Sequence, residues 1–143
     1  MLLSSKNAEI PAAAAKRECA VNVTLWAVQV LLALFFAFAG LNKLGGLQQE
    51  VVAAFTEIGF GQWFRHLTGA LELAGAIGLL IPRLSGLAAL GLTGIMLGAV
   101  LAHLFFLPPL ALALVPAFLG VVFGLIAWAR WPWKEAHLGR LER

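Results

Sequence analysis

Four runs of apolar residues follow one another along this chain, at about 23–42, 63–81, 84–107 and 109–129. Each run has about 20 residues, the length of helix that crosses the hydrocarbon core of a bilayer. Hydrophobic residues make up 62% of the 143-residue chain and charged residues only 12%, so a water-soluble fold of this size would expose much apolar surface. The sequence therefore predicts an all-α polytopic membrane protein, built as a four-transmembrane-helix bundle.

The connections between the four spans predict how the helices are arranged. Gly45 and Gly46 end the first span, and a short amphipathic helix is expected in the longer connection before Gly59. Its apolar residues recur at helical spacing with Gln and Glu between them, so we expect it to lie in the membrane interface between the first two spans. The other connections, at Pro82 and Pro108, are short, which makes consecutive spans antiparallel neighbours.

The basic residues predict the orientation of the spans. Four crossings place both chain ends and the Arg83 turn on one side of the membrane, and that side holds eight of the ten basic residues. The positive-inside rule then predicts a multi-pass protein of a bacterial inner (plasma) membrane with cytoplasmic termini. Its expected parts are an N-terminal tail at 1–22, a transmembrane domain at 23–129 and a C-terminal tail at 130–143. Residues 12–18 of the first tail have good helix propensity and are expected on the membrane surface.

Three ionisable residues stand out in or beside the apolar runs: Lys43 directly after the first run, Glu72 within the second and His103 within the third. The predicted threading brings all three toward the outer face, in a pocket between the first three spans. A charged side chain at membrane depth is costly, so it normally has a partner or a function. Further polar residues are expected near the same face: Asn42, which with His66 extends the candidate ligand-binding set, and Arg65 beside His66 at the rim.

Two interpretations of this polar cluster stay open. In one, the cluster is a site for a ligand. In the other, Lys43 and Glu72 form an ion pair, His103 adds a hydrogen bond, and the three residues only fix the register of the helices.

Several other chemistries are not expected. The sequence has no G-x-S-x-G, H-E-x-x-H, P-loop or C-x-x-C motif, so it names neither a reaction nor catalytic residues. A metal site is not expected, because only His103, His66 and Glu72 are available as ligands. Polar groups do not continue across the membrane, which argues against a channel. The single cysteine, Cys19, cannot form an intramolecular disulfide, and no basic face for nucleic acid is visible.

Small residues and a proline predict local features of the last two spans. Gly94 and Gly98 in the third span, and Gly120 and Gly124 in the fourth, have the spacing that permits close contact between membrane helices. Ordinary membrane-helix glycine is the alternative for both pairs. Pro116 removes a backbone hydrogen bond inside the fourth span, so a kink is expected there.

Five short motifs follow in order along the apolar part of the chain: FAGLNKL at 38–44, FTEIG at 55–59, GALELAG at 69–75, GLLIP at 78–82 and GAVLAH at 98–103. Their order and spacing resemble the DoxX-like family of membrane proteins over about residues 24–129. The resemblance implies a four-helix bundle, with the lysine, glutamate and histidine of the family at Lys43, Glu72 and His103.

The resemblance also implies a function. Some relatives belong to membrane oxidoreductase assemblies, including a thiosulfate:quinone oxidoreductase subunit, while others act as cargo receptors or chaperones. The implied role is a small subunit or accessory of a membrane redox complex. Its Lys/Glu/His pocket would take a quinone or another lipophilic ligand, and its partners would be the lipid bilayer and a larger membrane complex or a second copy. Redox members carry paired cysteines that this chain lacks, so thiol–disulfide exchange by the protein alone is not expected. No cofactor is expected in the chain itself, and any redox role would use a bound quinone or a partner subunit. The alternative role is that of a non-catalytic structural or chaperone-like membrane partner.

Overall fold

The computed structural model describes residues 2–131, with side chains from residue 12 onward. The described residues form helices joined by short connections, with no strand among them. In chain order the elements are α1 (Leu2–Gly45), α2 (Gln49–Ile58), α3 (Gln62–Leu80), α4 (Ser85–Phe105), the 3-10 helix η1 (Leu110–Ala113) and α5 (Leu114–Ala129). The expected all-α architecture is confirmed.

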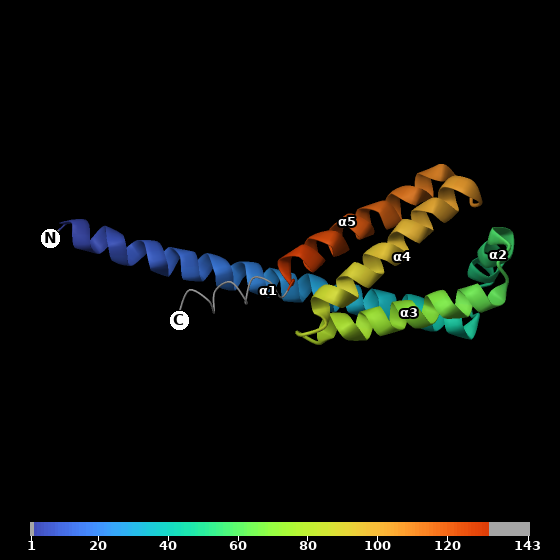
Figure 1. Cartoon of the computed structure of the whole chain (residues 1–143), viewed down its shortest axis with the longest axis horizontal. Coiled ribbons are helices and arrows are strands. Elements are labelled where there is room, and N and C mark those ends of the chain that lie inside the picture. The colour runs from blue at the N-terminus through green and yellow to red at the C-terminus, as the bar shows by residue number, and fades with distance from the viewer. Residues whose placement is uncertain (1, 132–143) are drawn as a thin grey trace.

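The first helix is longer than the sequence predicted. α1 is continuous over 44 residues, so the surface helix expected at 12–18 is not a separate element but part of α1. This segment is rich in alanine and contains no glycine, so nothing in it ends a helix. The amino-terminal part of α1 projects beyond the other helices (Figure 1). The tail expected at 130–143 lies outside the described residues except for Arg130 and Trp131.

Three helices among the described residues are long and apolar enough to cross a membrane: Ala12–Gly45, Ser85–Phe105 and Leu110–Ala129. α3 stands where the remaining span was expected and has 19 residues. Its amino-terminal half carries Arg65 and His66, and Glu72 lies near its middle, so its hydropathy is lower than that of the other three. The crossing of the membrane by α3 therefore stays a prediction.

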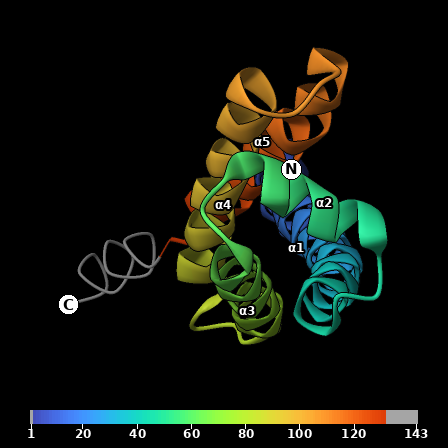
Figure 2. The same ribbon diagram turned by 90° about the vertical axis from the view of Figure 1, so that its right-hand side faces the viewer.

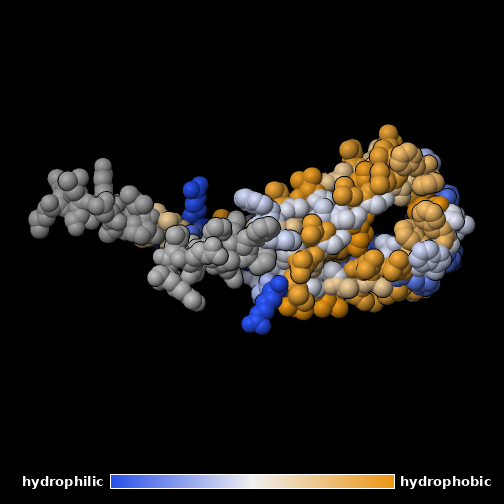
Figure 3. All heavy atoms as spheres, in the orientation of Figure 1, coloured by the Kyte–Doolittle hydropathy of each residue, from blue (hydrophilic) through white to orange (hydrophobic). Residues whose placement is uncertain are grey.

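The long helices pack as two pairs, α1 with α3 and α4 with α5. The pairs meet near the α3–α4 turn, where all four helices contribute to one buried core: Ala33, Phe36, Ala76, Leu79, Ala89, Leu92, Met96, Phe123, Ile126 and Ala127. Away from this core the pairs diverge, and α2 lies across the open end (Figures 1 and 2). The surface of the bundle is largely apolar and is hollowed between the two pairs near α2 (Figure 3). The molecule is therefore closed at one end and open at the other.

The short helix α2 confirms the amphipathic helix expected between the first two spans. Its apolar Phe55 is buried, while its Gln49 and Glu50 are exposed. Glycines with positive φ bound it on both sides: Gly46 at 61° before it and Gly59 at 83° after it. Only glycine adopts this conformation without strain, so the chain can turn sharply at each end of α2. The placement of α2 in the membrane interface stays a prediction.

Close helix contact occurs at a glycine pair that the sequence analysis did not select. A Cβ atom added to Gly40 of α1 would lie 2.7 Å from the backbone oxygen of Gly69 in α3, so the two backbones touch there. An added Cβ at Gly94, Gly98 or Gly124 would meet nothing within 4 Å. The close packing expected at these three glycines is not present within the described residues, whereas a Cβ added to Gly120 would lie 3.3 Å from the Cβ of Met96 in α4.

The fourth span begins with a short 3-10 helix before it becomes α-helical. The chain forms η1 first and changes to α-helix at Leu114, so Pro116 lies in the first turn of α5. The kink expected at Pro116 stays a prediction.

Candidate ligand pocket

A salt bridge joins α1 to α3 at the open end of the bundle. The Lys43 Nζ atom donates to both carboxylate oxygens of Glu72, at 2.8 Å to Oε1 and 2.7 Å to Oε2. Glu72 is 3% exposed, and Lys43 is half-buried. The backbone contact of Gly40 with Gly69, one turn away on each helix, brings the two side chains within reach. The predicted ion pair is therefore present.

The salt bridge lies in the wall of a cavity of about 560 Å³ between α2, α3 and α4. The α2 wall consists of Val51, Ala54, Phe55 and Ile58, and the α3 wall of Phe64, Leu67, Thr68, Leu71 and Glu72. The α4 wall is built from small residues on one helix face, with Ile95 and His103 beside them: Gly91, Gly94, Gly98, Ala99 and Ala102. The glycines of α4 therefore leave space for the cavity instead of admitting another helix.

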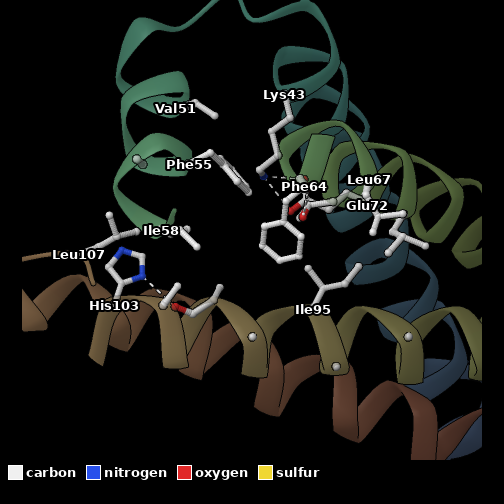
Figure 4. A pocket seen from close by; sticks show the side chains of 18 residues that line it. Lys43, Val51, Phe55, Ile58, Phe64, Leu67, Glu72, Ile95, His103 and Leu107 are labelled. Carbon is white, nitrogen blue, oxygen red and sulfur yellow. Dashed lines mark hydrogen bonds and ion pairs between the residues drawn. The ribbon is translucent and has the colours of Figure 1, made fainter. Parts of the chain in front are cut away.

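His103 lines the same cavity but stands apart from the salt bridge. Its Nδ1 atom is 2.9 Å from the backbone oxygen of Ala99, one turn earlier in α4. Figure 4 shows the imidazole ring beside Leu107 and the carboxyl end of α2, with Ile58 between it and Lys43. The three residues expected to meet thus share one cavity, but only Lys43 and Glu72 contact each other.

Two further candidates, Asn42 and His66, do not line this cavity. Asn42 is buried and donates to the backbone oxygen of Phe38 in its own helix. Successive residues of a helix differ in direction by about 100°, so the side chain next to Lys43 faces elsewhere. His66 is exposed, and its Nε2 atom is 3.2 Å from Arg65 Nη2.

Arg65 was expected at the rim of the pocket, but it is buried and hydrogen-bonded to the end of α1. It is 7% exposed, donates from Nε to Gln62 Oε1 at 2.7 Å, and donates from Nη1 to the backbone oxygen of Lys43. It therefore satisfies a carbonyl in the last turn of α1 and places positive charge at the negative end of that helix. The sequence contained a signal for this role, because Arg65, Gly69 and Glu72 follow at i, i+4 and i+7 on one face of α3.

A second polar network ties the closed end together. Gln29 is completely buried, donates to the backbone oxygen of Leu79 at 2.9 Å and accepts from Arg130 Nε at 2.9 Å. Arg130 also donates to Asn22 Oδ1 at 2.8 Å and lies over the Trp26 ring, 5.4 Å from its centroid. Partial burial lowers the pKa of the Arg130 guanidinium, which still stays protonated. This network links α1, α3 and the end of α5 and lies away from the cavity.

The cavity can hold an apolar molecule and make a small number of hydrogen bonds to it. Among residues 2–131 no three His, Cys, Asp or Glu side chains converge where they could hold a metal ion. Cys19 is exposed on α1 and is not part of the cavity lining. The polar side chains of the pocket are therefore one ammonium group, one carboxylate, one imidazole and the Thr68 hydroxyl, which donates to the backbone oxygen of Phe64. The rest of the wall is apolar.

Apolar helices of membrane length, packed around a partly polar pocket, define the chain as a helical membrane protein. It belongs to the DoxX-like family, whose model matches residues 27–130. The match begins within α1 and includes α2, α3, α4 and α5, so every residue of the pocket lies inside it. No curated protein and no solved structure matches the chain.

Proposed function

We propose that this protein binds a lipophilic ligand of the quinone type and acts as a small subunit or accessory of a membrane redox complex. The observation that carries the proposal is the cavity between α2, α3 and α4, which combines apolar walls with a half-buried cation that is paired with a buried carboxylate. Ligand sites in proteins have this composition, with few polar groups in a mostly apolar lining. The association with redox assemblies comes from the family resemblance. The lipophilic ligand of the quinone type is inferred from the chemistry of the pocket.

Lys43 is the group best suited to a ligand carbonyl. An ammonium group has three N–H donors, and Glu72 accepts two of them. The third remains for an oxygen of the ligand. Glu72 keeps the ammonium group in place and balances its charge, so a neutral ligand meets no net charge in the apolar wall.

The proposed arrangement in the membrane has four crossings, with α3 as the second. The charge of Glu72 is then hidden from lipid by its salt bridge, and the long contact of α3 with α1 covers one face of α3. α2 lies in the outer interface of the bacterial inner membrane, and both termini are cytoplasmic. The pocket then opens toward the outer leaflet, where a lipid-soluble ligand can enter beside α2.

Filling the cavity tests the proposal. Gly94 lines the cavity, and an added Cβ there meets nothing within 4 Å, so Gly94→Leu places its side chain in the space the ligand needs. Gly124 is equally free of neighbours but is not part of the lining, which makes Gly124→Leu the matched control. We expect a short-chain ubiquinone analogue, titrated in detergent and observed by native mass spectrometry, to bind the parent and Gly124→Leu but not Gly94→Leu. Equal binding by all three proteins would place the quinone outside this cavity.

The alternative, a structural or chaperone-like membrane partner, also has an observation in its favour. The salt bridge joins α1 to α3 where the two helix pairs diverge, and the His103 hydrogen bond stays within α4. In that role the charges only hold helices, and the cavity is filled by lipid. A partner protein that co-purifies stoichiometrically, together with a cavity that takes no quinone, would favour this function.

A further inference from the structure

His103 carries a defined hydrogen-bonding direction. Its Nδ1 atom is 2.9 Å from the backbone oxygen of Ala99. A carbonyl oxygen can only accept a hydrogen bond, so Nδ1 must carry the proton of the pair. In the neutral imidazole the other ring nitrogen, Nε2, then has a lone pair and acts only as an acceptor.

This acceptor is not used within the described residues. His103 lines the cavity, and its only hydrogen bond there is the one from Nδ1 to Ala99. Ile58 and Leu107, which stand beside the ring in Figure 4, are apolar and offer no donor. The charged groups of the cavity, Lys43 and Glu72, satisfy each other away from the ring. An acceptor in an apolar cavity gains from a donor that enters with a ligand.

Lys43 and His103 therefore favour different groups on a ligand. Lys43 has an N–H to donate, which suits a carbonyl or ether oxygen. His103 has a lone pair to offer, which suits a hydroxyl group. A ligand with only carbonyl oxygens would place an oxygen lone pair against that of Nε2.

We propose that the cavity selects ligands with a hydroxyl group on an apolar ring, of the phenol or hydroquinone class, and that His103 Nε2 accepts the hydrogen bond from this hydroxyl. This inference rests on the proposed function, because it concerns the same cavity, and it adds which form of ligand is preferred. For a quinone and its reduced form, the reduced form is the better ligand at His103. The small residues Gly98, Ala99 and Ala102 of α4 line the same cavity as His103 and leave room for the ring beside the imidazole.

A pair of probes that differ in one hydrogen-bond donor tests this. 4-Decylphenol and 4-decylanisole have the same chain and ring, but the second has a methyl ether in place of the hydroxyl. We expect the parent protein to bind the phenol about three- to tenfold more tightly, the ratio that one net hydrogen bond gives. In His103→Phe the ratio should fall to about one. The matched control is His66→Phe, which removes an exposed histidine outside the cavity and should keep the parent ratio.

The outcomes of this experiment test the role of His103 and the proposed function separately. Equal affinity of the parent protein for both probes overturns the role of His103 while the cavity remains a ligand site. Binding of neither probe overturns the proposed function together with this inference. A preference for the phenol that survives in His103→Phe assigns the acceptor to another group, such as Glu72, and also overturns it. His103→Gln supplies an amide oxygen as acceptor, so it should retain part of the preference, and a thermal unfolding scan of each variant shows that the fold is kept.

Discussion

At the scale of single residues, this protein stabilises each buried charge with a specific partner. Glu72 has Lys43, and Arg65 has a carbonyl of α1 together with Gln62. Removing one member of such a set leaves the other desolvated without compensation, which costs more than the set itself contributes. The cost of a substitution therefore depends on which charges remain buried.

The Lys43–Glu72 pair gives a prediction of this kind. Lys43→Met and Glu72→Leu should each lower the free energy of unfolding by on the order of 3 kcal/mol, because each leaves one charge unpaired. The double variant should recover most of this loss, since two apolar side chains of similar volume replace the pair. Thermal unfolding of the parent, the two single variants and the double variant in one detergent measures how strongly the two residues are coupled. A double variant no more stable than the weaker single variant would mean that the pair is not a coupled unit.

Arg65 gives a second prediction. Arg65→Met removes the hydrogen bonds to Gln62 and to the Lys43 carbonyl and should lower the free energy of unfolding by about 1.5–3 kcal/mol. His66→Ala, at the exposed neighbouring position, should change it by less than about 0.5 kcal/mol. The same detergent unfolding experiment compares the two variants. Similar stability of Arg65→Met and the parent would show that the cap on α1 is dispensable.

At the scale of helices, glycine has two opposite uses in this bundle. Gly40 and Gly69 let the backbones of α1 and α3 touch, and this contact aligns the salt bridge. Gly91, Gly94 and Gly98 of α4 face the cavity and keep it open. Gly94 and Gly98 have the spacing of a helix-contact motif and yet border the cavity, so this spacing alone does not distinguish a helix contact from a cavity wall.

Adding a single methyl group separates these uses. Gly40→Ala should destabilise the protein by about 1–3 kcal/mol, because the new Cβ would lie 2.7 Å from the Gly69 oxygen and the helices would have to move apart. Gly94→Ala should stabilise it by about 0.5–1 kcal/mol, because it improves helix propensity and meets no neighbour. Thermal unfolding in detergent measures both. A loss of stability in Gly94→Ala would contradict the open space that the structure places there.

At the scale of the whole molecule, the two helix pairs form a wedge that is closed by a core at one end and covered by α2 at the other. Many large apolar side chains point outward along these pairs, as expected where lipid is the solvent. The position of the wedge in the membrane follows from whether α3 crosses it. Four crossings put α2 and the α3–α4 turn on opposite sides.

Cysteine labelling of intact bacterial cells decides this point. In a Cys19→Ser background, Leu47→Cys marks the connection to α2, where Leu47 is 77% exposed, and Arg83→Cys marks the exposed α3–α4 turn. A thiol reagent that does not cross membranes should label Leu47→Cys only. Labelling of both, or of neither, before cell lysis would place the two positions on one side and contradict a membrane-spanning α3.

Sequence reasoning succeeded where the requirement is local or set by the solvent. The apolar runs predicted the helices, Gly59 predicted the end of α2, and an acid and a base at similar depth predicted the Lys43–Glu72 pair. It did not separate Asn42 and His66, which stand next to other polar candidates in the sequence but do not line the cavity. It also failed for Gly94 and Gly98, because their spacing does not say what lies opposite.

The sequence by itself determined that the chain is a helical membrane protein, because so high an apolar fraction leaves no other solvent for its surface. Only the tertiary structure decided which helix faces meet. In lipid an apolar face gains no hydrophobic free energy by packing on another helix, so hydropathy does not select the buried face. The backbone contact of Gly40 with Gly69, the buried cap by Arg65 and the divergence of the two helix pairs make that choice, and the cavity is its consequence.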